Sequence, residues 1–341
     1  MHIPDGFVDL PTAVATGAVS LGVVAYSLKK TGRELGERTV PLLGVTAAFI
    51  FAAQMLNFPV AGGTSGHFLG AVLAATLLGP YAGVIVMTVV LIVQALGMAD
   101  GGITALGANV FNMGVVAVFA GFALYLLFRR LLPRTLTGRL AAVAVASWSS
   151  VVLASVVCSL ELALSGTVPL GIALSAMAAV HMIIGLGEAL ITTAVAAAVF
   201  AARPDLVKGF DLPLPVEGQG TGLPAALSRG GSRRTRLWAS VASALVVAAA
   251  LAVFVSPFAS SAPDGLERVA ADQGFQTEAA ERPVWDVSPL PDYQLPGIES
   301  EKVAKAVAGL IGTLALFALV LLLGRFLGRL RPHPAQDPDS A

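Results

Sequence analysis

Long apolar runs alternate with short polar segments along this chain. A helix needs about 20 apolar residues to cross a bilayer, and stretches approaching that length occur nine times in the 341 residues. The predicted spans cover roughly 11–28, 40–57, 66–79, 81–98, 109–128, 140–164, 173–201, 236–255 and 302–324. The third is short and ends at Gly79-Pro80, so we expect it to be tilted, broken or partly buried in protein rather than facing lipid.

The amino-acid composition indicates which class of protein has this pattern of apolar runs. Hydrophobic residues make up 56% of the chain and charged residues 12%, and the mean hydropathy is +0.82. Soluble domains carry about 25% charged residues, so we expect an all-α integral membrane protein. The predicted architecture is a seven-helix bundle followed by a two-helix transmembrane hairpin. The single cysteine, Cys158, excludes an internal disulfide and is expected to act as a small buried hydrophobe.

The basic residues indicate the direction of the spans, because Lys and Arg are enriched in the cytoplasmic loops of membrane proteins. Here they occur in alternate connections and in the tail, whereas the connections at 58–65, 99–108 and 165–172 contain none. With nine spans, this pattern predicts an extracytoplasmic N-terminus and a cytoplasmic C-terminus. The basic residues concerned are Lys29, Lys30, Arg33, Arg38, Arg129, Arg130, Arg134, Arg139, Arg203, Lys208, Arg229, Arg233, Arg234, Arg236, Arg325, Arg329 and Arg331.

A stretch with several prolines and the run GQGTG divides the chain. We interpret residues 202–235 as a flexible cytoplasmic linker. It separates a seven-span unit, residues 1–201, from a hairpin over 236–325, which a cytoplasmic tail follows over 326–341. The hairpin's outer loop, 256–300, carries eight acidic residues against two arginines. Two interpretations stay open: the loop raises the local concentration of a cation, or it is a solvated surface loop.

The first two residues offer nitrogen ligands for a metal ion. The α-amine of Met1, the amide nitrogen of His2 and the His2 Nδ1 atom can close two fused chelate rings, and His67 can supply a fourth nitrogen. Planar nitrogen ligation selects Ni(II) or Cu(II), with Co(II) in a distorted version, and suits neither Mg nor Ca. The chelate needs a free amine. No signal-peptide pattern occurs, and the large side chain of His2 disfavours removal of Met1.

A histidine near a membrane terminus is more often an interfacial residue without a ligand. Two features favour ligation here. His2 and His67 both fall on the predicted outer side, and His67 lies in the small-residue stretch AGGTSGHFLG with Gly62, Gly66 and Gly70. Because small residues let another segment approach the backbone closely, the first ten residues are predicted to pack against this stretch and to bring His2 to His67.

Polar residues inside the predicted spans form three pairs, each on one helix face. They are Gln54 and Asn57, Asn109 and Asn112, and His181 and Glu188. Ionisable residues inside a membrane are functional candidates by default, so these side chains are candidates for lining the path of an ion or supporting its ligands. A satisfied network of hydrogen bonds between helices is the simpler interpretation, and both stay open.

Motifs for ATP hydrolysis and for zinc proteolysis are missing from the sequence. The phosphate-binding pattern G-x-x-x-x-G-K-[ST] does not occur, and neither does H-E-x-x-H. Active uptake would therefore take its energy from other chains. We expect a transporter subunit rather than an enzyme.

Six stretches of the sequence resemble a known family. MHIPDGF at 1–7, FAAQMLNFPVAGGTSGHFLG at 51–70, ALGANVFNMG at 105–114 and HMIIGLGEALIT at 181–192 resemble the CbiM/NikM substrate-binding proteins of energy-coupling factor (ECF) transporters, which take up cobalt or nickel. SSAPDGLERVA at 260–270 and SPLPDYQLPGI at 288–298 resemble the PDGLE module, a component similar to NikN and CbiN, here fused to its partner. The resemblance covers nearly the whole chain.

This resemblance implies a fold, a site and partners. Residues 1–201 would form the seven-helix substrate-binding (S) component, and Met1, His2 and His67 would hold the transported Ni(II) or Co(II) ion. The implied partners are two cytoplasmic ABC-type ATPase subunits and a transmembrane coupling (T) component, and we expect no nucleic-acid partner. The chain would then be the substrate-binding permease component of an ATP-driven uptake system in the cell membrane.

Two other functions stay open. A secondary carrier would move a transition metal on an ion gradient, without ATPase subunits. A membrane enzyme would use His181 and Glu188 as acid–base groups. Uptake by the purified chain alone in liposomes would favour the carrier. A greater effect of changing His181 or Glu188 than of changing His2 would favour the enzyme.

Overall fold

The computed structural model describes residues 1–34, 36, 39–60, 63–204, 207, 233–279, 284–285 and 287–329. Within them nearly all regular structure is helical, as predicted for an all-α membrane protein. The α-helices are α1 (Leu10–Glu34), α2 (Thr39–Gln54), α3 (Ala71–Leu78), α4 (Pro80–Met98), α5 (Leu106–Asn109), α6 (Ala117–Leu131), α7 (Leu136–Leu164), α8 (Leu170–Ala202), α9 (Arg233–Ala250), α10 (Gly265–Gln273) and α11 (Glu301–Arg329). Gly62, most of the predicted linker and His333 lie outside the described residues.

Shorter elements complete the described chain. A π-helical turn, Val110–Val116, joins α5 to α6, and another, Leu251–Val255, extends α9. Two strands, β1 (Phe58–Val60) and β2 (Thr64–Gly66), form an antiparallel hairpin in which Phe58 pairs with Gly66. Three-residue 3-10 turns lie at Ser256–Phe258, Gln276–Glu278 and Pro291–Tyr293.

Seven helices among the described residues are long and apolar enough to cross a membrane. They are α1, α4, the continuous α5–α6 segment, α7, α8, the α9 segment with its extension, and α11. The helix α2 is shorter, at 16 residues, and is buried on nearly all sides, which is the environment expected of a helix that is apolar all round. Each of the nine predicted apolar segments contains a helix of this structure.

The third predicted span, 66–79, does not cross as a helix. α3 has eight residues, which at 1.5 Å per residue gives about 12 Å, less than half of the ~30 Å hydrocarbon core. Its first part forms β2 and an irregular segment instead, and the helix ends at Gly79, whose φ of 91° favours glycine. Since seven of its eight residues are buried, the apolar sequence of α3 faces protein rather than lipid.

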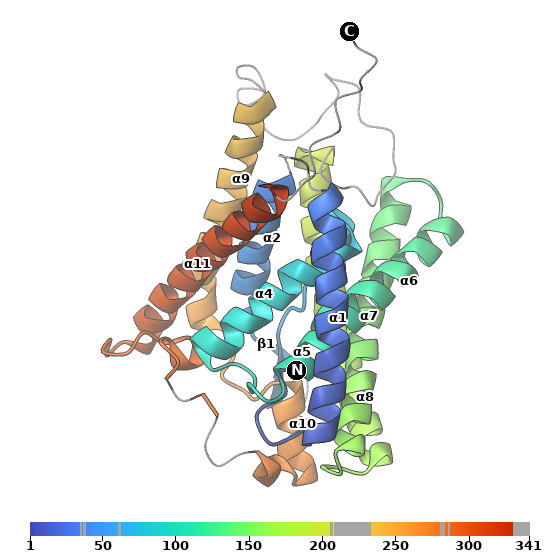
Figure 1. Ribbon diagram of the computed structural model, residues 1–341, viewed down its shortest axis with the longest axis vertical. Helices are drawn as coiled ribbons and strands as arrows, with labels where there is room; N and C mark the ends of the chain where they lie inside the picture. The colour runs from blue at the N-terminus through green and yellow to red at the C-terminus, as the bar shows by residue number, and fades with distance from the viewer. Residues whose placement is uncertain are drawn as a thin grey trace.

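The C-terminal hairpin packs on the first part of the chain. Helices α9 and α11 both lie against α2, on one side of the molecule (Figure 1). The packing is close, because a Cβ atom at Gly312 would lie 2.4 Å from Phe51 Cζ. A glycine is therefore required where α11 crosses α2.

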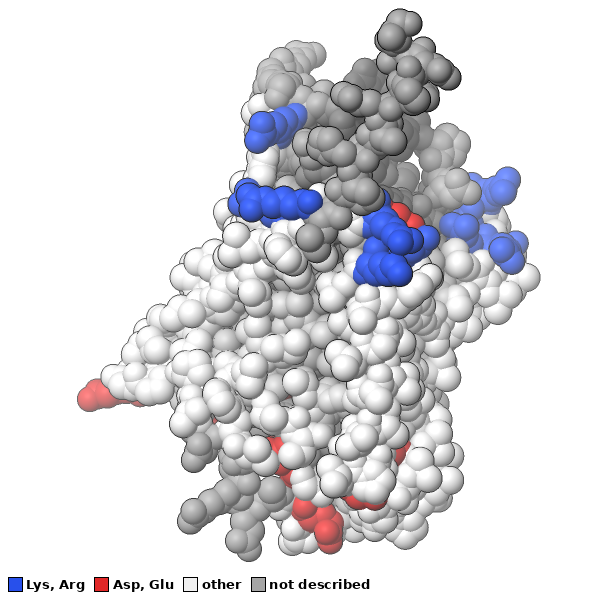
Figure 2. Space-filling view, viewed as in Figure 1, with Lys and Arg blue, Asp and Glu red and all other residues white. Residues whose placement is uncertain are grey.

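The two ends of the bundle differ in charge. The N-terminus and α10 lie at one end (Figure 1). On the face drawn in Figure 2, most Lys and Arg side chains gather at the other end, while Asp and Glu side chains lie mainly at the end that holds α10. This face of the protein therefore has a basic end and an acidic end, and the N-terminus lies towards the acidic one.

Candidate metal centre

The N-terminal segment, residues 1–9, folds back into the bundle. Asn109 of α5 binds it through the fully buried Ile3: Ile3 N donates to Asn109 Oδ1 at 2.8 Å, and Asn109 Nδ2 donates to Ile3 O at 3.1 Å. Gly102 N donates to the same carbonyl oxygen at 2.8 Å. These bonds use both backbone polar groups of Ile3, so they fix the position of the two residues that precede it.

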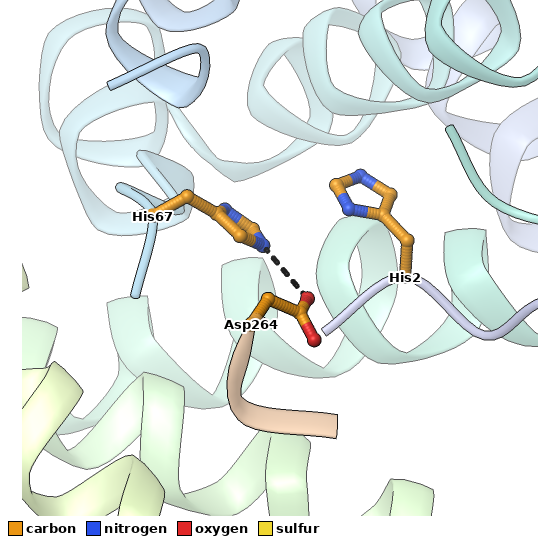
Figure 3. A group of neighbouring side chains, drawn as sticks. All are labelled: His2, His67 and Asp264. Carbon is orange, nitrogen blue, oxygen red and sulfur yellow. Dashed lines mark ion pairs between the residues drawn. The ribbon is translucent and has the colours of Figure 1, made fainter. Parts of the chain in front are cut away.

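His67 brings a ring nitrogen to the amine of Met1. The residue follows β2, and its Nε2 atom lies 2.8 Å from Met1 N. Its Nδ1 atom lies 3.0 Å from the carbonyl oxygen of Phe68, which assigns the ring proton to Nδ1 and leaves the Nε2 lone pair free. The rings of His2 and His67 stack, with centroids 5.0 Å apart. Figure 3 shows the two rings and the carboxylate of Asp264 around a common space.

Two side chains hold the peptide that follows His67. Glu188 of α8 accepts hydrogen bonds from Leu69 N at 2.6 Å and Gly70 N at 2.9 Å. Gln54 of α2 donates from Nε2 to Leu69 O at 2.8 Å. The donors are the backbone N–H groups that precede α3, a favourable place for a negative charge. Glu188 and Gln54 therefore position the backbone beside His67 and do not point at the amine of Met1.

A second network holds the ring of His2. Its Nε2 atom lies 3.2 Å from Gln94 Oε1, and its Nδ1 atom lies 3.2 Å from Asp100 Oδ1. Gln94 Nε2 donates to Gln54 Oε1 at 2.7 Å and to the Tyr293 hydroxyl at 3.0 Å, and that hydroxyl donates to Asp100 Oδ2. The same network thus connects His2 to Gln54, which supports the peptide after His67.

The electrostatics of the site favour neutral imidazoles beside a carboxylate. Burial lowers the pKa of His2 against the opposing effect of Asp100. Burial, the α-ammonium of Met1 and His2 together lower the pKa of His67 well below its usual value. Burial alone would raise the pKa of Asp264, but the α-ammonium and His67 outweigh it and the pKa falls. Neutral imidazole is the form that binds a metal ion.

A small cavity adjoins these groups. Its volume is about 20 Å³, and Met1, His67, His181 and Gly265 are among the residues that line it. A cavity of roughly 10–15 Å³ is enough for one water molecule. The space beside the amine and His67 therefore has the size of a water molecule or a bare ion.

The comparisons with known proteins decide the family. Residues 2–206 match the model of the CbiM family, described as a cobalt uptake substrate-specific transmembrane region, and residues 238–329 match the PDGLE domain. The chain belongs to the CbiM family of cobalt and nickel transport proteins. The resemblance seen in the sequence motifs is thereby confirmed.

Full-length relatives combine the same two parts. The "Putative fused nickel transport protein NikMN" of Archaeoglobus fulgidus is 37% identical over 328 residues, which cover 96% of this chain and 99% of that protein. The fused nickel transport protein NikMN of Rhodobacter capsulatus is 30% identical, covering 93% of this chain and 95% of that protein. A crystal structure of a truncated transition metal transporter superimposes with a TM-score of 0.54 at 34% identity, covering 59% of this chain and 99% of that one.

The other predicted residues of the CbiM-family region lie outside the His2–His67 pair. Asn57 contributes its backbone carbonyl oxygen, which accepts from Ser260 N at 2.7 Å. Asn112 Nδ2 donates to Glu161 Oε2 at 2.6 Å inside the bundle. His181 reaches the cavity, with Nδ1 2.8 Å from the carbonyl oxygen of Met177. Although His181 and Glu188 are both buried on α8, each has its own partners.

Four residues near the site were not singled out from the sequence: Gln94, Asp100, Asp264 and Tyr293. The sequence did contain an indication of two of them. Asp264 lies in the stretch SSAPDGLERVA and Tyr293 in SPLPDYQLPGI, and both stretches resemble the PDGLE module. Asp100 is an acidic residue in a connection without Lys or Arg. Gln94 lies inside a predicted span, like Gln54, and the same argument would have selected it.

Proposed function

We propose that this chain is the substrate-binding membrane component of an ATP-driven ECF-type transporter that takes up Ni(II) or Co(II). In this proposal Met1 and His2 supply three nitrogen ligands, the amine and the His2 amide each releasing a proton to water, and His67 supplies the fourth. The membership of the CbiM family and the names of the NikMN relatives, which describe nickel transport, support the choice of ion.

The observation that carries the proposal is the approach of His67 Nε2 to the amine of Met1, at 2.8 Å. Met1 N, His2 N and His2 Nδ1 belong to adjacent residues, so their chelate needs no other part of the chain. The His2 ring, however, has to turn its Nδ1 atom away from Asp100 Oδ1, which lies 3.2 Å from it. The fourth ligand has to come from elsewhere, and His67 Nε2 stands beside the amine, to which it is hydrogen-bonded. Four nitrogens of this kind match the planar ligation that Ni(II) prefers.

The direction of transport follows from the distribution of charge. Basic residues are enriched on the cytoplasmic side of membrane proteins, which supports an extracytoplasmic position for the opposite end, with Met1 and α10. The site then faces the side from which a metal ion arrives. Since the sequence lacks a phosphate-binding loop for ATP, two cytoplasmic ATPase subunits and a transmembrane coupling component supply the energy.

The division of the chain is part of the proposal. Residues 1–201 are the metal-binding unit, 202–235 the cytoplasmic linker, 236–325 the PDGLE hairpin and 326–341 the cytoplasmic tail. The two family matches, 2–206 and 238–329, support the first and third of these. His181, Glu188, Gln54, Asn57, Asn109 and Asn112 support the site or its surroundings and do not bind the ion.

Calorimetric titration with Ni(II), Co(II) and Cu(II) tests the site, on full-length protein with a native, untagged N-terminus. We expect His67→Ala, His2→Ala or one extra residue ahead of Met1 to weaken Ni(II) binding by at least about 100-fold, since each removes a ligand or the chelate. His333→Ala, a matched change of a histidine in the tail, should leave binding unchanged. Binding that survives the extra N-terminal residue would contradict the chelate.

Reconstitution separates the proposal from its rivals. In liposomes the chain alone should not accumulate Ni(II), and accumulation should require the ATPase subunits, the coupling component and ATP. Accumulation by the chain alone on an ion gradient would make it a secondary carrier. An activity that depends on His181 and Glu188 but not on His2 would make it an enzyme.

A further inference from the structure

The external loop of the PDGLE hairpin reaches the metal centre. Ser65 of β2 binds this loop twice: its N atom donates to Pro263 O at 2.8 Å, and its Oγ donates to Ala262 O at 2.7 Å. Ser65 lies two residues before His67. The loop is therefore attached to the strand that carries a proposed ligand, and Asp264, its next residue, comes beside that ligand.

The carboxylate of Asp264 has two oxygens with different partners. Oδ1 caps α10 by accepting from Glu267 N at 2.9 Å, and Glu267 Oε2 accepts from Asp264 N at 3.0 Å in return. Oδ2 lies 2.6 Å from Met1 N and 3.9 Å from His67 Nε2. One oxygen thus orients the side chain, and the other points into the site.

The start of α10 is pressed against α8, which fixes this orientation. A Cβ atom at Gly265 would lie 2.9 Å from both His181 Cε1 and Ile184 Cδ1, so only glycine allows this approach. Leu266 follows and is fully buried. Asp264 itself has a side chain that is 14% exposed. The carboxylate is therefore held at the site by its neighbours and is largely shielded from water.

We propose that Asp264 Oδ2 is a ligand of the transported ion, so that the PDGLE hairpin completes the metal centre with one oxygen. This inference rests on the proposed function, in that the ion is held by Met1, His2 and His67. His2, His67 and Asp264 each offer one ligand atom within 4.8 Å of the others. Ligand bonds of about 2.1 Å place ligands at a right angle to each other about 3.0 Å apart, so His67 Nε2 and Asp264 Oδ2, at 3.9 Å, have to move closer to seat one ion.

Charge balance supports the same assignment. When Met1 N binds a metal ion, it first releases a proton to the surrounding water, and the ion pair between its ammonium group and Asp264 is lost. A buried carboxylate without a partner is strongly unfavourable. The divalent ion arrives at the place that the ammonium charge leaves, and it becomes the new partner of Oδ2. Nitrogen ligands in a plane leave the axial positions of the ion open for an oxygen.

The test uses variants that preserve the helix cap. Asp264→Ser removes the carboxylate but keeps a residue that caps helices well, and Asp264→Asn removes the charge with almost no change of shape. Asp272→Ser is the matched control, because Asp272 is exposed on the same helix and pairs with Arg268. Each full-length protein, with a native N-terminus, is titrated with Ni(II) and Co(II) and examined at saturation by X-ray absorption at the metal edge.

We expect both Asp264 variants to bind Ni(II) and Co(II) at least about tenfold more weakly, with Asp272→Ser unchanged. The edge spectrum of wild-type protein with Ni(II) should report five-coordinate metal, and that of Asp264→Ser should shift towards four-coordinate planar metal. A four-coordinate wild type, an unchanged spectrum in Asp264→Ser, or unchanged affinity in both variants would overturn the assignment. Failure of the wild type to bind metal at all would instead refute the proposed function.

Discussion

At the scale of single residues, Glu188 illustrates how a buried carboxyl group can position the backbone beside His67 without contacting the His67 ring. Its two oxygens accept the N–H groups of Leu69 and Gly70, at 2.6 and 2.9 Å. Thr192 Oγ1 donates to Oε1 as well, at 3.2 Å. The carboxylate is fully buried, and these three bonds compensate its desolvation. These hydrogen bonds stabilise one conformation of the peptide next to His67.

The change Glu188→Gln replaces one acceptor oxygen by an amide group that donates. One backbone N–H would then face a donor, at a cost of about 1–3 kcal/mol in the free energy of unfolding. Because the peptide beside His67 loses its support, we expect Ni(II) to bind about 10–100-fold more weakly. Thermal unfolding and calorimetric titration measure the two effects. The control is Glu299→Gln, at an exposed position, and equal behaviour of the two variants would contradict this role.

At the scale of elements, the N-terminal segment packs closely against the connection between α4 and α5. Asp5 Oδ1 accepts from both N and Oγ1 of Thr104, at 2.8 and 2.7 Å. The segment lies so close to the connection between α4 and α5 that a Cβ atom at Gly102 would lie 2.3 Å from Asp5 N. Its position therefore depends on glycine at 102 as much as on its own residues.

Gly102→Ala should displace the N-terminal segment and separate the amine from His67. We expect Ni(II) binding to weaken by at least about tenfold. Met1 and His2 would be displaced, and a displaced ligand weakens metal binding in the same way as the loss of a group that orients it. Gly171→Ala is the matched control: a Cβ atom there meets nothing within 4 Å, and alanine is favoured over glycine in a helix by about 0.5–1 kcal/mol. Tight Ni(II) binding by Gly102→Ala would show that the close packing at Gly102 does not position the amine of Met1.

At the scale of the whole molecule, the two family-matched parts share one site. Met1 and Asp264 are 263 positions apart in the chain and form an ion pair. Tyr293 enters the same region from a later part of the hairpin and donates to Asp100, which lies beside His2. Burial and the charge of Asp100 raise the pKa of Tyr293 well above its usual value, so it remains a phenol that can donate.

Loosening the hairpin should therefore disturb the metal centre from a distance. In Gly312→Leu the new side chain would enter the ring of Phe51 and the methyl group of Met98, and overpacking of this kind costs about 1–3 kcal/mol. We expect a lower melting temperature and weaker Ni(II) binding. Gly328→Leu is the control on the same helix, because a Cβ atom there meets nothing within 4 Å. It should change neither the melting temperature nor Ni(II) binding. Unchanged binding in a destabilised Gly312→Leu protein would show that the hairpin and the site are independent.

Several features were accessible from the sequence because they depend on local chemistry. The apolar segments locate the helices, since the length of a span is set by the bilayer and not by its neighbours. The chelating atoms of Met1 and His2 are adjacent along the chain, so their geometry needs no fold. The small residues around His67, such as Gly66, indicated a close approach of another segment. In the structure the side chain that approaches Gly66 is Ile184 of α8, and the N-terminal segment reaches His67 itself, with Met1 N 2.8 Å from His67 Nε2.

Other features were decided only by the tertiary structure. The sequence of α3 is as apolar as that of a lipid-facing helix, and only its packing shows that seven of its eight residues are buried in protein instead. Glu188 could have paired with His181, seven positions away on the same helix, but the neighbouring backbone offered it two better donors. In both cases the outcome depends on which surface lies opposite, and a local pattern of residues does not contain that surface.

The sequence by itself thus determined a helical membrane protein whose first residues can chelate a metal ion, because hydrophobicity and covalent connectivity act locally. The tertiary structure decided which groups surround the chelate: Asp264 from the hairpin, Tyr293 from its loop, and the peptide support from Glu188. These groups come from distant parts of the chain. Burial of apolar surface brings them together, and it is the packing of the helices that sets their distances.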